Sequence, residues 1–201
     1  MSRAFLKAAY EAAEYYEQHL ITALPYSTDL DLLSRAIEIA TCPGLVLEFG
    51  VATGRTITHM ASRLPSTIYG FDSFEGLPEA WRSGFGKGAF AGSLPPVPPN
   101  AQLIKGWFSD TLAEFLVDHK EQLSLLHVDC DLYSSTKTIF DLLAPRLGPG
   151  AVIVFDEYWN YPGWREHEQK AFFEFLAKSG LSYRYDSVPS HQQVCVVLTE
   201  K

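Results

Sequence analysis

The sequence predicts an α/β protein built on a doubly wound, mostly parallel sheet, and three observations support this fold class. Short apolar runs alternate along the chain with longer amphipathic stretches, as strands alternate with helices in parallel sheets. The apolar runs are continuous, which is typical of strands buried on both faces. Two β-rich runs end the chain, separated by a turn short enough for a hairpin. We expect one domain over residues 1–201, with helices in 1–43 and a seven-stranded core in 44–201.

Two helices are expected before the sheet. Apolar side chains between Arg3 and Ile21 recur at three- and four-residue spacing, which places them on one helix face. The second helix is expected from Asp29 to Ala40. Ser27 and Thr28 are candidates to cap its amino end, and Cys42-Pro43-Gly44 stops it.

The core alternates strand and helix from Gly44 onward. Five parallel strands are predicted, at Leu45–Phe49, Thr67–Phe71, Gln102–Lys105, Leu123–Val128 and Ala151–Phe155. Helices are expected where amphipathic stretches open with capping residues, at Thr56–Arg63, Thr111–Leu116, Thr136–Leu147 and Arg165–Lys178. An antiparallel hairpin of Leu181–Tyr185 and Val194–Leu198 follows, with its turn at Ser187–His191.

A glycine- and proline-rich stretch, Ser83–Asn100, interrupts the alternation. It holds four glycines and four prolines in 18 residues, more than the ~12–15 that structureless loops usually reach. One interpretation is a disordered surface loop. The interspersed Phe85, Phe90 and Leu94 favour the other, a lid over a ligand.

Composition and charge narrow the function classes. The chain has 16 Lys and Arg against 24 Asp and Glu, a net charge of −8, so a nucleic-acid backbone would be repelled. Apolar runs stay far below the ~18 residues of a membrane helix, and residues 1–10 do not resemble a secretory leader. We therefore expect a cytoplasmic protein without nucleic-acid or membrane partners. Cys42, Cys130 and Cys195 have no metal-site or disulfide spacing and are expected to be reduced.

The segment EFGVATGRT, residues 48–56, places a glycine turn between a strand and a helix. Glycine lets the backbone approach a ligand, and the Gly-x-x-x-Gly spacing differs from dinucleotide and P-loop motifs. Glu48 would repel phosphates but suits a ligand that carries an amine. We expect cofactor contacts from Glu48, Gly50, Thr53, Gly54 and Thr56.

An acid also ends the second strand. Asp72 follows Glu48 by 24 residues, close to the ~20 at which nucleotide-binding folds place a carboxylate for the ribose diol. We expect Asp72 and the adjacent Ser73 to contact the cofactor. The alternative is a structural role for Asp72 as a turn or cap acid.

Acids gather at the ends of the fourth and fifth strands. Neighbouring parallel strands lie about 4.8 Å apart, so carboxylates at their tips converge and repel unless a cation or proton lies among them. Oxygen ligands suit Mg²⁺ first, and Mn²⁺ or Ca²⁺ next. We expect Asp129, Asp156 and Glu157 to bind the metal and Asp131 to act as general base. The alternative makes Asp131 and Ser134 helix caps. His127 is expected to be a core histidine.

In this order, EFGVATGRT, YGFDSFEGLPE, KGWFSDTL, LHVDCDLYSSTKT and FDEYWNYPGW resemble the macrocin O-methyltransferase family, over about Leu45–Phe175. The resemblance implies a Rossmann-like class I methyltransferase fold, S-adenosylmethionine as cofactor, and Mg²⁺-dependent methylation of a sugar hydroxyl on a natural product. It places the acid pair on Asp129 and Asp131 and the metal pair on Asp156 and Glu157, where Glu157 replaces the more usual Asp. By the same resemblance, Gly106 and Trp107 would border the adenine.

The expected function is therefore S-adenosylmethionine-dependent, metal-assisted O-methylation of a small-molecule acceptor. The alternatives are a catechol or phenol O-methyltransferase with the same metal site, and a non-catalytic binding protein that keeps the cofactor fold. Lys137 is a rival base, although its place in a helix suggests an exposed face. The aromatic segment Tyr158–Trp164 is expected to line the acceptor pocket or to form a subunit contact, so a homodimer stays open.

Overall fold

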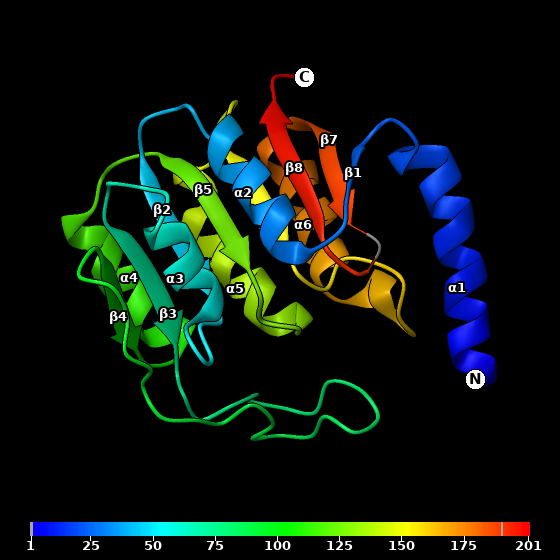
Figure 1. Cartoon of the computed structure of the whole chain (residues 1–201), viewed down its shortest axis with the longest axis horizontal. Coiled ribbons are helices and arrows are strands. Elements are labelled where there is room, and N and C mark those ends of the chain that lie inside the picture. The colour runs from blue at the N-terminus through cyan, green and yellow to red at the C-terminus, as the bar shows by residue number, and fades with distance from the viewer. Residues whose placement is uncertain (1, 190) are drawn as a thin grey trace.

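The structure is a computed structural model that describes residues 2–189 and 191–201. Its centre is one eight-stranded sheet in the order β1-β7-β8-β6-β5-β2-β3-β4 (Figure 1). Neighbouring strands are parallel except for β8, which runs antiparallel to both β6 and β7. The strands are β1 Leu24–Tyr26, β2 Leu45–Phe49, β3 Ile68–Asp72, β4 Ala101–Lys105, β5 Leu123–Val128, β6 Val152–Phe155, β7 Ser182–Pro189 and β8 Val194–Thr199.

Helices cover both faces of this sheet, and each face has its own hydrophobic core. Side chains from α1, α4, α5 and α6 share one core with Leu47 and Phe49, while α2 and α3 share the other with Val46. This division follows from the alternation of side chains along a strand that is buried on both faces. The helices are α1 Arg3–Tyr15, α2 Asp29–Ile39, α3 Arg55–Ala61, α4 Phe108–Asp118, α5 Tyr133–Leu143 and α6 Glu168–Ser179. Shorter helical turns are η1 Tyr16–Leu20, η2 Ala144–Arg146 and η3 Trp164–Glu166.

The predicted fold class is confirmed, but the predicted count of seven strands is wrong. The eighth strand, β1, has three residues and pairs in parallel with β7 at the edge of the sheet. Its length and Pro25 hide it in the sequence, because proline is tolerated in strands mainly at edges. The hairpin of β7 and β8 is present. Of its predicted turn, Ser190 lies outside the described residues, as does Met1.

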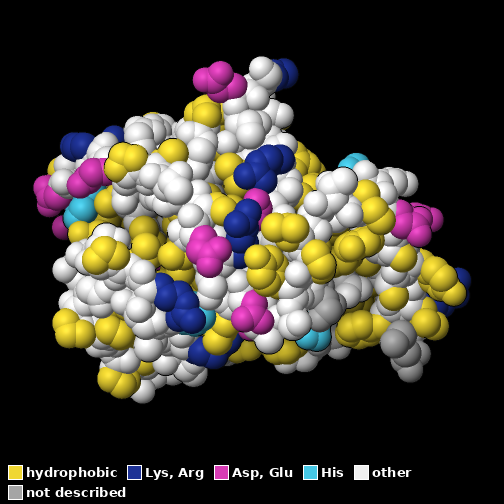
Figure 2. Space-filling view, turned by 45° about the horizontal axis from the view of Figure 1, so that its top comes forward, with side chains coloured by type: hydrophobic (Ala, Val, Ile, Leu, Met, Phe, Trp, Pro, Cys, Tyr) yellow, Lys and Arg dark blue, Asp and Glu magenta, His cyan; other side chains and the backbone are white. Residues whose placement is uncertain are grey.

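The first helix buries only part of the apolar face predicted for it, which consisted of Phe5, Leu6, Ala9, Ala12, Ala13 and Tyr16. Ala8, Ala12 and Tyr15 are buried, whereas Phe5 and Leu6 are 52% and 46% exposed. Figure 1 shows α1 at one end of the molecule, and Figure 2 shows apolar side chains exposed at that end. Within the described residues, no helix is both long and apolar enough to cross a membrane.

Four tyrosine hydroxyls connect α1 to the sheet. Tyr185 of β7 is their hub, since its hydroxyl bonds those of Tyr15 on α1, Tyr158 after β6 (2.7 Å) and Tyr183 (3.3 Å). Tyr15 also packs edge-on against Trp164, with ring centroids 5.1 Å apart. A partly buried hydroxyl network of this kind fixes how the helix docks, because each hydroxyl left without a partner carries a desolvation cost.

Replacing this hub should weaken the fold without changing the core. We expect Tyr185→Phe to lower the free energy of unfolding by about 2 kcal/mol, because the Tyr15 and Tyr158 hydroxyls lose their shared partner. Urea denaturation followed by circular dichroism measures the effect. Tyr183→Phe is the matched control and should cost less, since it removes only the longest bond. Equal losses in the two variants would contradict the hub assignment.

Candidate active site

The carboxyl ends of four parallel strands meet at one edge of the sheet. Phe49 of β2 pairs with Phe71 of β3 and Val128 of β5, and Val128 pairs with Phe155 of β6. The loops that follow these strands line a cavity of about 790 Å³, a size usual for small-ligand sites. Eight of the predicted site residues line it: Gly50, Asp72, Ser73, Trp107, Asp129, Asp131, Asp156 and Glu157. The other predicted residues lie outside its lining: Glu48 in β2, Thr53, Gly54 and Gly106 in the loops after β2 and β4, and Thr56 in the first turn of α3.

The acids at this edge form one partly buried, mutually repelling cluster. Burial, and after it the charge of Asp156, raises the pKa of Asp129, of Glu157 and of Asp131, the last to about 7. One oxygen of Glu157, Oε2, is buried without a hydrogen-bond partner. Carboxylates in this state are stabilised by protons or by a cation, so the arrangement suits a hard divalent ion.

Glu168, at the start of α6, is a fifth member of the cluster that the sequence did not indicate. It is fully buried, its Oε2 accepts a hydrogen bond from the Glu157 backbone amide (3.1 Å), and its Oε1 is buried without a partner. Burial and the charge of Asp131 raise its pKa. Glutamate is common at the first position of a helix because its charge interacts favourably with the helix dipole. The sequence pattern therefore gave no indication that Glu168 lies beside the acid cluster.

Asp131 is held in a strained backbone conformation. Its φ is +63°, in the left-handed region that non-glycine residues occupy rarely and mainly at functional sites. The capping interpretation of Asp131 and Ser134 is wrong. The N-cap of α5 is Leu132, without a side-chain cap, and Ser134 Oγ instead donates to Glu79 (2.6 Å).

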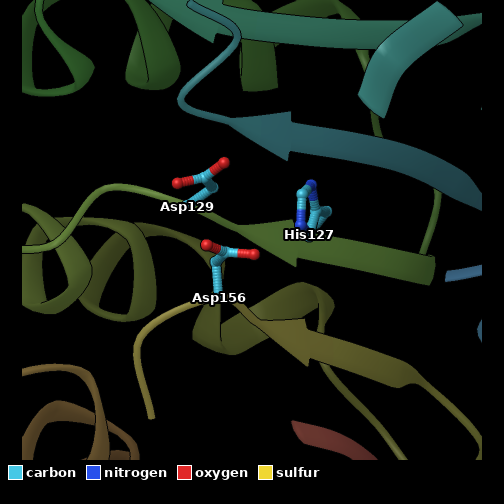
Figure 3. A group of neighbouring side chains, drawn as sticks. All are labelled: His127, Asp129 and Asp156. Carbon is cyan, nitrogen blue, oxygen red and sulfur yellow. The ribbon is translucent and has the colours of Figure 1, made fainter. Parts of the chain in front are cut away.

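His127 and Glu48 form a buried pair beneath the acids. Their strand positions are register partners, and His127 Nδ1 lies 2.9 Å from Glu48 Oε1. Burial lowers the pKa of His127, but the hydrogen bond to Glu48 and the charge of Glu48 together outweigh burial, so the pKa of His127 is raised overall. Figure 3 shows His127 on β5 with Asp129 and Asp156 beyond it, and ligand atoms of the three lie within 4.8 Å of one another. Since Nδ1 is bonded to Glu48, Nε2 is the ring atom available to the aspartates or to an ion.

Asp72 holds the glycine turn in place. Its Oδ2 accepts hydrogen bonds from the backbone amides of Val51 and Ala52 (both 2.9 Å), and its Oδ1 accepts one from Phe74 (2.7 Å). Gly50 has φ +95°, and a Cβ there would lie 1.6 Å from the Asp129 carbonyl oxygen. The turn-acid role is therefore observed. A carboxylate has about four acceptor sites, so the predicted ribose contact stays compatible with these bonds.

Comparison with known proteins identifies the family. A family profile described as a methyltransferase domain matches residues 47–158, more than half of the chain. The chain belongs to this methyltransferase family. The matched stretch includes the glycine turn, Asp72, and the acids that directly follow β5 and β6, namely Asp129, Asp131, Asp156 and Glu157.

Curated relatives agree with the resemblance to macrocin O-methyltransferases. The methyltransferase domain is 28% identical to a tetracenomycin rhamnosyl 4'-O-methyltransferase of Streptomyces olivaceus, covering 64% of this chain and 59% of that protein. It is also 28% identical to mycinamicin III 3''-O-methyltransferase of Micromonospora griseorubida, covering 89% and 79%. The chain spans about three fifths of the length of the Streptomyces olivaceus protein, and likewise of a demethyldecarbamoylnovobiocin O-methyltransferase of Streptomyces niveus.

Solved structures give the same fold. A calicheamicin methyltransferase superposes with a TM-score of 0.67 at 25% identity, covering 84% of this chain and 76% of that one. The O-methyltransferase NovP superposes with the same score at 21% identity, covering 86% and 79%.

In this methyltransferase domain, the loop predicted as a lid forms one wall of the cavity through Phe85, Lys87 and Phe90. Its backbone is tied to the preceding segment, because Leu77 donates to Ala89 and Gly88 donates to Leu77 (both 2.9 Å). Leu94 is 49% exposed. These contacts describe a folded loop, and its opening and closing as a lid stays a prediction.

Two other predicted residues or segments lie away from the cavity. Lys137 bonds Asp141 (2.6 Å) one turn along α5 and borders a different groove, between α5 and α6. Tyr158, Tyr161 and Trp164 are fully buried. That aromatic segment is therefore part of the core, and both the pocket-lining and the subunit-contact interpretations are wrong for these three side chains.

Neutralising Asp72 should loosen the glycine turn and weaken cofactor binding together. Asp72→Asn replaces one carboxylate oxygen with a donor that cannot accept the Val51 or Phe74 amide. We expect at least a tenfold weaker affinity for adenosylhomocysteine, measured by calorimetry, and faster hydrogen exchange at Val51 and Ala52. Glu75→Gln, an exposed acid nearby, is the control and should bind normally. Unchanged affinity in Asp72→Asn would contradict the assignment.

Proposed function

We propose that the chain is an S-adenosylmethionine-dependent O-methyltransferase assisted by a divalent cation. Its acceptor is a small molecule, and the methylated group is a sugar hydroxyl of a glycosylated natural product. The observation that carries the proposal is the position of Asp131 and the acid cluster across one cavity from the glycine turn and Asp72. The printed activities of the relatives, O-methylations of a rhamnosyl tetracenomycin and of mycinamicin III, support the acceptor class.

The cofactor side of the cavity has the groups that S-adenosylmethionine requires. When bound, S-adenosylmethionine supplies a methyl group on a sulfonium that loses its charge on transfer. Asp72 would accept a hydrogen bond from a ribose hydroxyl with the one acceptor site that the three amides leave free. Ser73 lies beside it, and Trp107 would pack against the adenine. Gly50 keeps the backbone of the turn close to β5. Thr53, Gly54, Thr56 and Gly106 shape the turns around these contacts.

The acid cluster fits a divalent cation. Asp129, Asp156 and Glu157 would hold it, since all three residues line the cavity and Glu157 Oε2 lacks a hydrogen-bond partner. His127 Nε2 is a further donor close to Asp129 and Asp156. A cation in this position would lower the pKa of an acceptor hydroxyl.

Asp131 would accept the proton that the acceptor hydroxyl loses as its oxygen bonds to the methyl carbon. A pKa of about 7 suits a general base at neutral pH. The strained backbone fixes the direction of this carboxylate, and the surrounding residues orient the two reactants. No protein nucleophile is needed, since positioning and charge lower the barrier.

A catechol or phenol acceptor is the second candidate. Phe85 and Phe90 line the cavity and stack on each other with centroids 5.3 Å apart, and such rings also suit a planar aromatic acceptor. Turnover of a catechol, with none of any glycoside or sugar, would favour this reading over a sugar acceptor.

The role of Asp131 separates an enzyme from a binding protein. We expect Asp131→Asn to lower kcat roughly 10²–10⁴-fold, while calorimetric affinity for adenosylhomocysteine stays within a few fold. Methyl transfer is measured with labelled S-adenosylmethionine. Asp141→Asn, on the exposed side of α5, should keep full activity. Full activity of the Asp131→Asn variant would contradict the assignment of Asp131 as the general base.

Cation binding should be visible in stability. Saturation at ~100 times the dissociation constant adds about 2.7 kcal/mol, so we expect Mg²⁺ or Mn²⁺ to raise the wild-type Tm. Asp156→Asn should lose this rise, and in chelator it should be at least as stable as wild type because one repelling charge is gone. Glu166→Gln, an exposed acid in η3, should keep the rise. A wild-type Tm that ignores these cations would count against the metal site.

A further inference from the structure

Positive charge in the cavity comes from the loop between β3 and β4. Of the described residues that line the cavity, two are cationic, Arg82 and Lys87, while five are acids. Both cations lie on the loop wall, and four of the acids follow β5 and β6. The site therefore has a positive wall and a negative wall, an arrangement that would orient a ligand with one anionic end.

Arg82 is held by its own turn. The Phe85 amide donates to the Arg82 carbonyl (2.8 Å) and the Trp81 amide donates to the Phe85 carbonyl (3.0 Å). Gly84, with φ +94°, permits this tight reversal. The base of the positive wall is thus a small hairpin and not a free loop end.

Aromatic rings fix the guanidinium of Arg82. Its Cζ lies 3.8 Å from the centroid of the Trp81 ring, 5.0 Å from that of Tyr161 and 5.2 Å from that of Phe85. Trp81 and Tyr161 are themselves buried. Rings at these distances stabilise a cation without using its hydrogen-bond donors, and they reduce the entropy lost when it binds a ligand.

The hydrogen-bond donors of the Arg82 guanidinium are available to a ligand. Its Nε is buried with no hydrogen-bond partner, and no ion pair found among the described residues includes Arg82. Its charge nevertheless reaches the acid cluster, because it lowers the pKa of Asp131 against the effect of burial. A pre-oriented guanidinium with free donors at a cavity wall is suited to bind an oxyanion in a bidentate manner.

We propose that Arg82 and Lys87 bind a phosphate group of the acceptor, so that the substrate is a phosphorylated sugar, as a sugar phosphate or a nucleoside diphosphate sugar. This inference rests on the proposed methylation of a sugar hydroxyl, and it places that step before the sugar is joined to the natural product. Two positive charges match a phosphate, at about −1.5 to −2, better than a single carboxylate. The acidic wall repels the phosphate, so the sugar hydroxyl is the end that faces Asp131.

The test compares a neutral sugar with phosphorylated sugars and with a sugar carboxylate. Rhamnose, the sugar named in one relative, is used as methyl rhamnoside, rhamnose 1-phosphate and thymidine diphosphate rhamnose, with galacturonate as the carboxylate arm. Calorimetry is done with adenosylhomocysteine and Mg²⁺ present. We expect both phosphorylated sugars to bind at least tenfold more tightly than the methyl rhamnoside and the galacturonate.

Variants then separate recognition from charge balance. We expect Arg82→Gln to abolish the preference for phosphate and to raise KM with little change in kcat, and Arg82→Lys to restore part of it. Lys87→Gln should weaken phosphate binding several fold. Arg165→Gln is the matched control, because Arg165 also stacks on a tryptophan, Trp164 at 4.2 Å, outside the cavity lining. Each variant should bind adenosylhomocysteine normally.

Three outcomes would overturn the inference. Equal binding of the neutral and phosphorylated sugars, with Arg82→Gln lowering kcat for both alike, would reduce Arg82 to a balancing charge for Asp131 and leave the proposed function standing. Preference for galacturonate would replace phosphate by carboxylate. Methylation of neutral glycosides only would also overturn the phosphate site and leave the proposed function standing. By contrast, Arg82-dependent phosphate binding without methyl transfer to any acceptor would defeat the proposed function and not the phosphate site.

Discussion

The active-site region depends on one constraint, the common end point of four parallel strands. Because Phe49, Phe71, Val128 and Phe155 are register partners across the sheet, the residues that follow them must meet at one edge. Asp72, Asp129 and Asp156 are such residues. The hydrophobic strands thus force carboxylates together, and burial at this edge also raises the pKa of Asp129 and of Glu157.

Other residues surround these crowded carboxylates and interact with them. Glu48 and His127 form a buried pair below the acids, and Glu168 reaches in from α6. Arg82 supplies positive charge from the loop wall, held by aromatic rings and not by a carboxylate. Repelling charges that persist in a folded protein are characteristic of sites where function requires them, at a cost in stability. In this domain the cost is concentrated where a cation and an acceptor hydroxyl would lie.

The sequence was most informative where local pattern and topology coincide. The continuous apolar runs located the central strands, since Leu45–Phe49 and Leu123–Val128 are long enough to be unmistakable and are buried on both faces. The acids at strand ends followed from the parallel order.

The three-residue β1 was missed because an edge strand with a proline carries no such pattern. Glu168 and Arg82 were missed because their roles arise from tertiary contacts, of Glu168 with the Glu157 amide after β6 and of Arg82 with the ring of Tyr161. Asp72 was located correctly, but its grip on the Val51 and Ala52 amides is a matter of side-chain geometry that spacing does not show.

The central claim is that the crowded acids form a cation site next to the methyl donor. A crystal structure with Mn²⁺ and adenosylhomocysteine tests it most directly, with anomalous scattering to locate the metal. The account predicts an anomalous peak coordinated by Asp129, Asp156 and Glu157, with the Asp131 carboxylate facing the sulfur of the cofactor. Adenosylhomocysteine bound in the cavity with no manganese peak among these acids, or with the peak elsewhere in the chain, would contradict it.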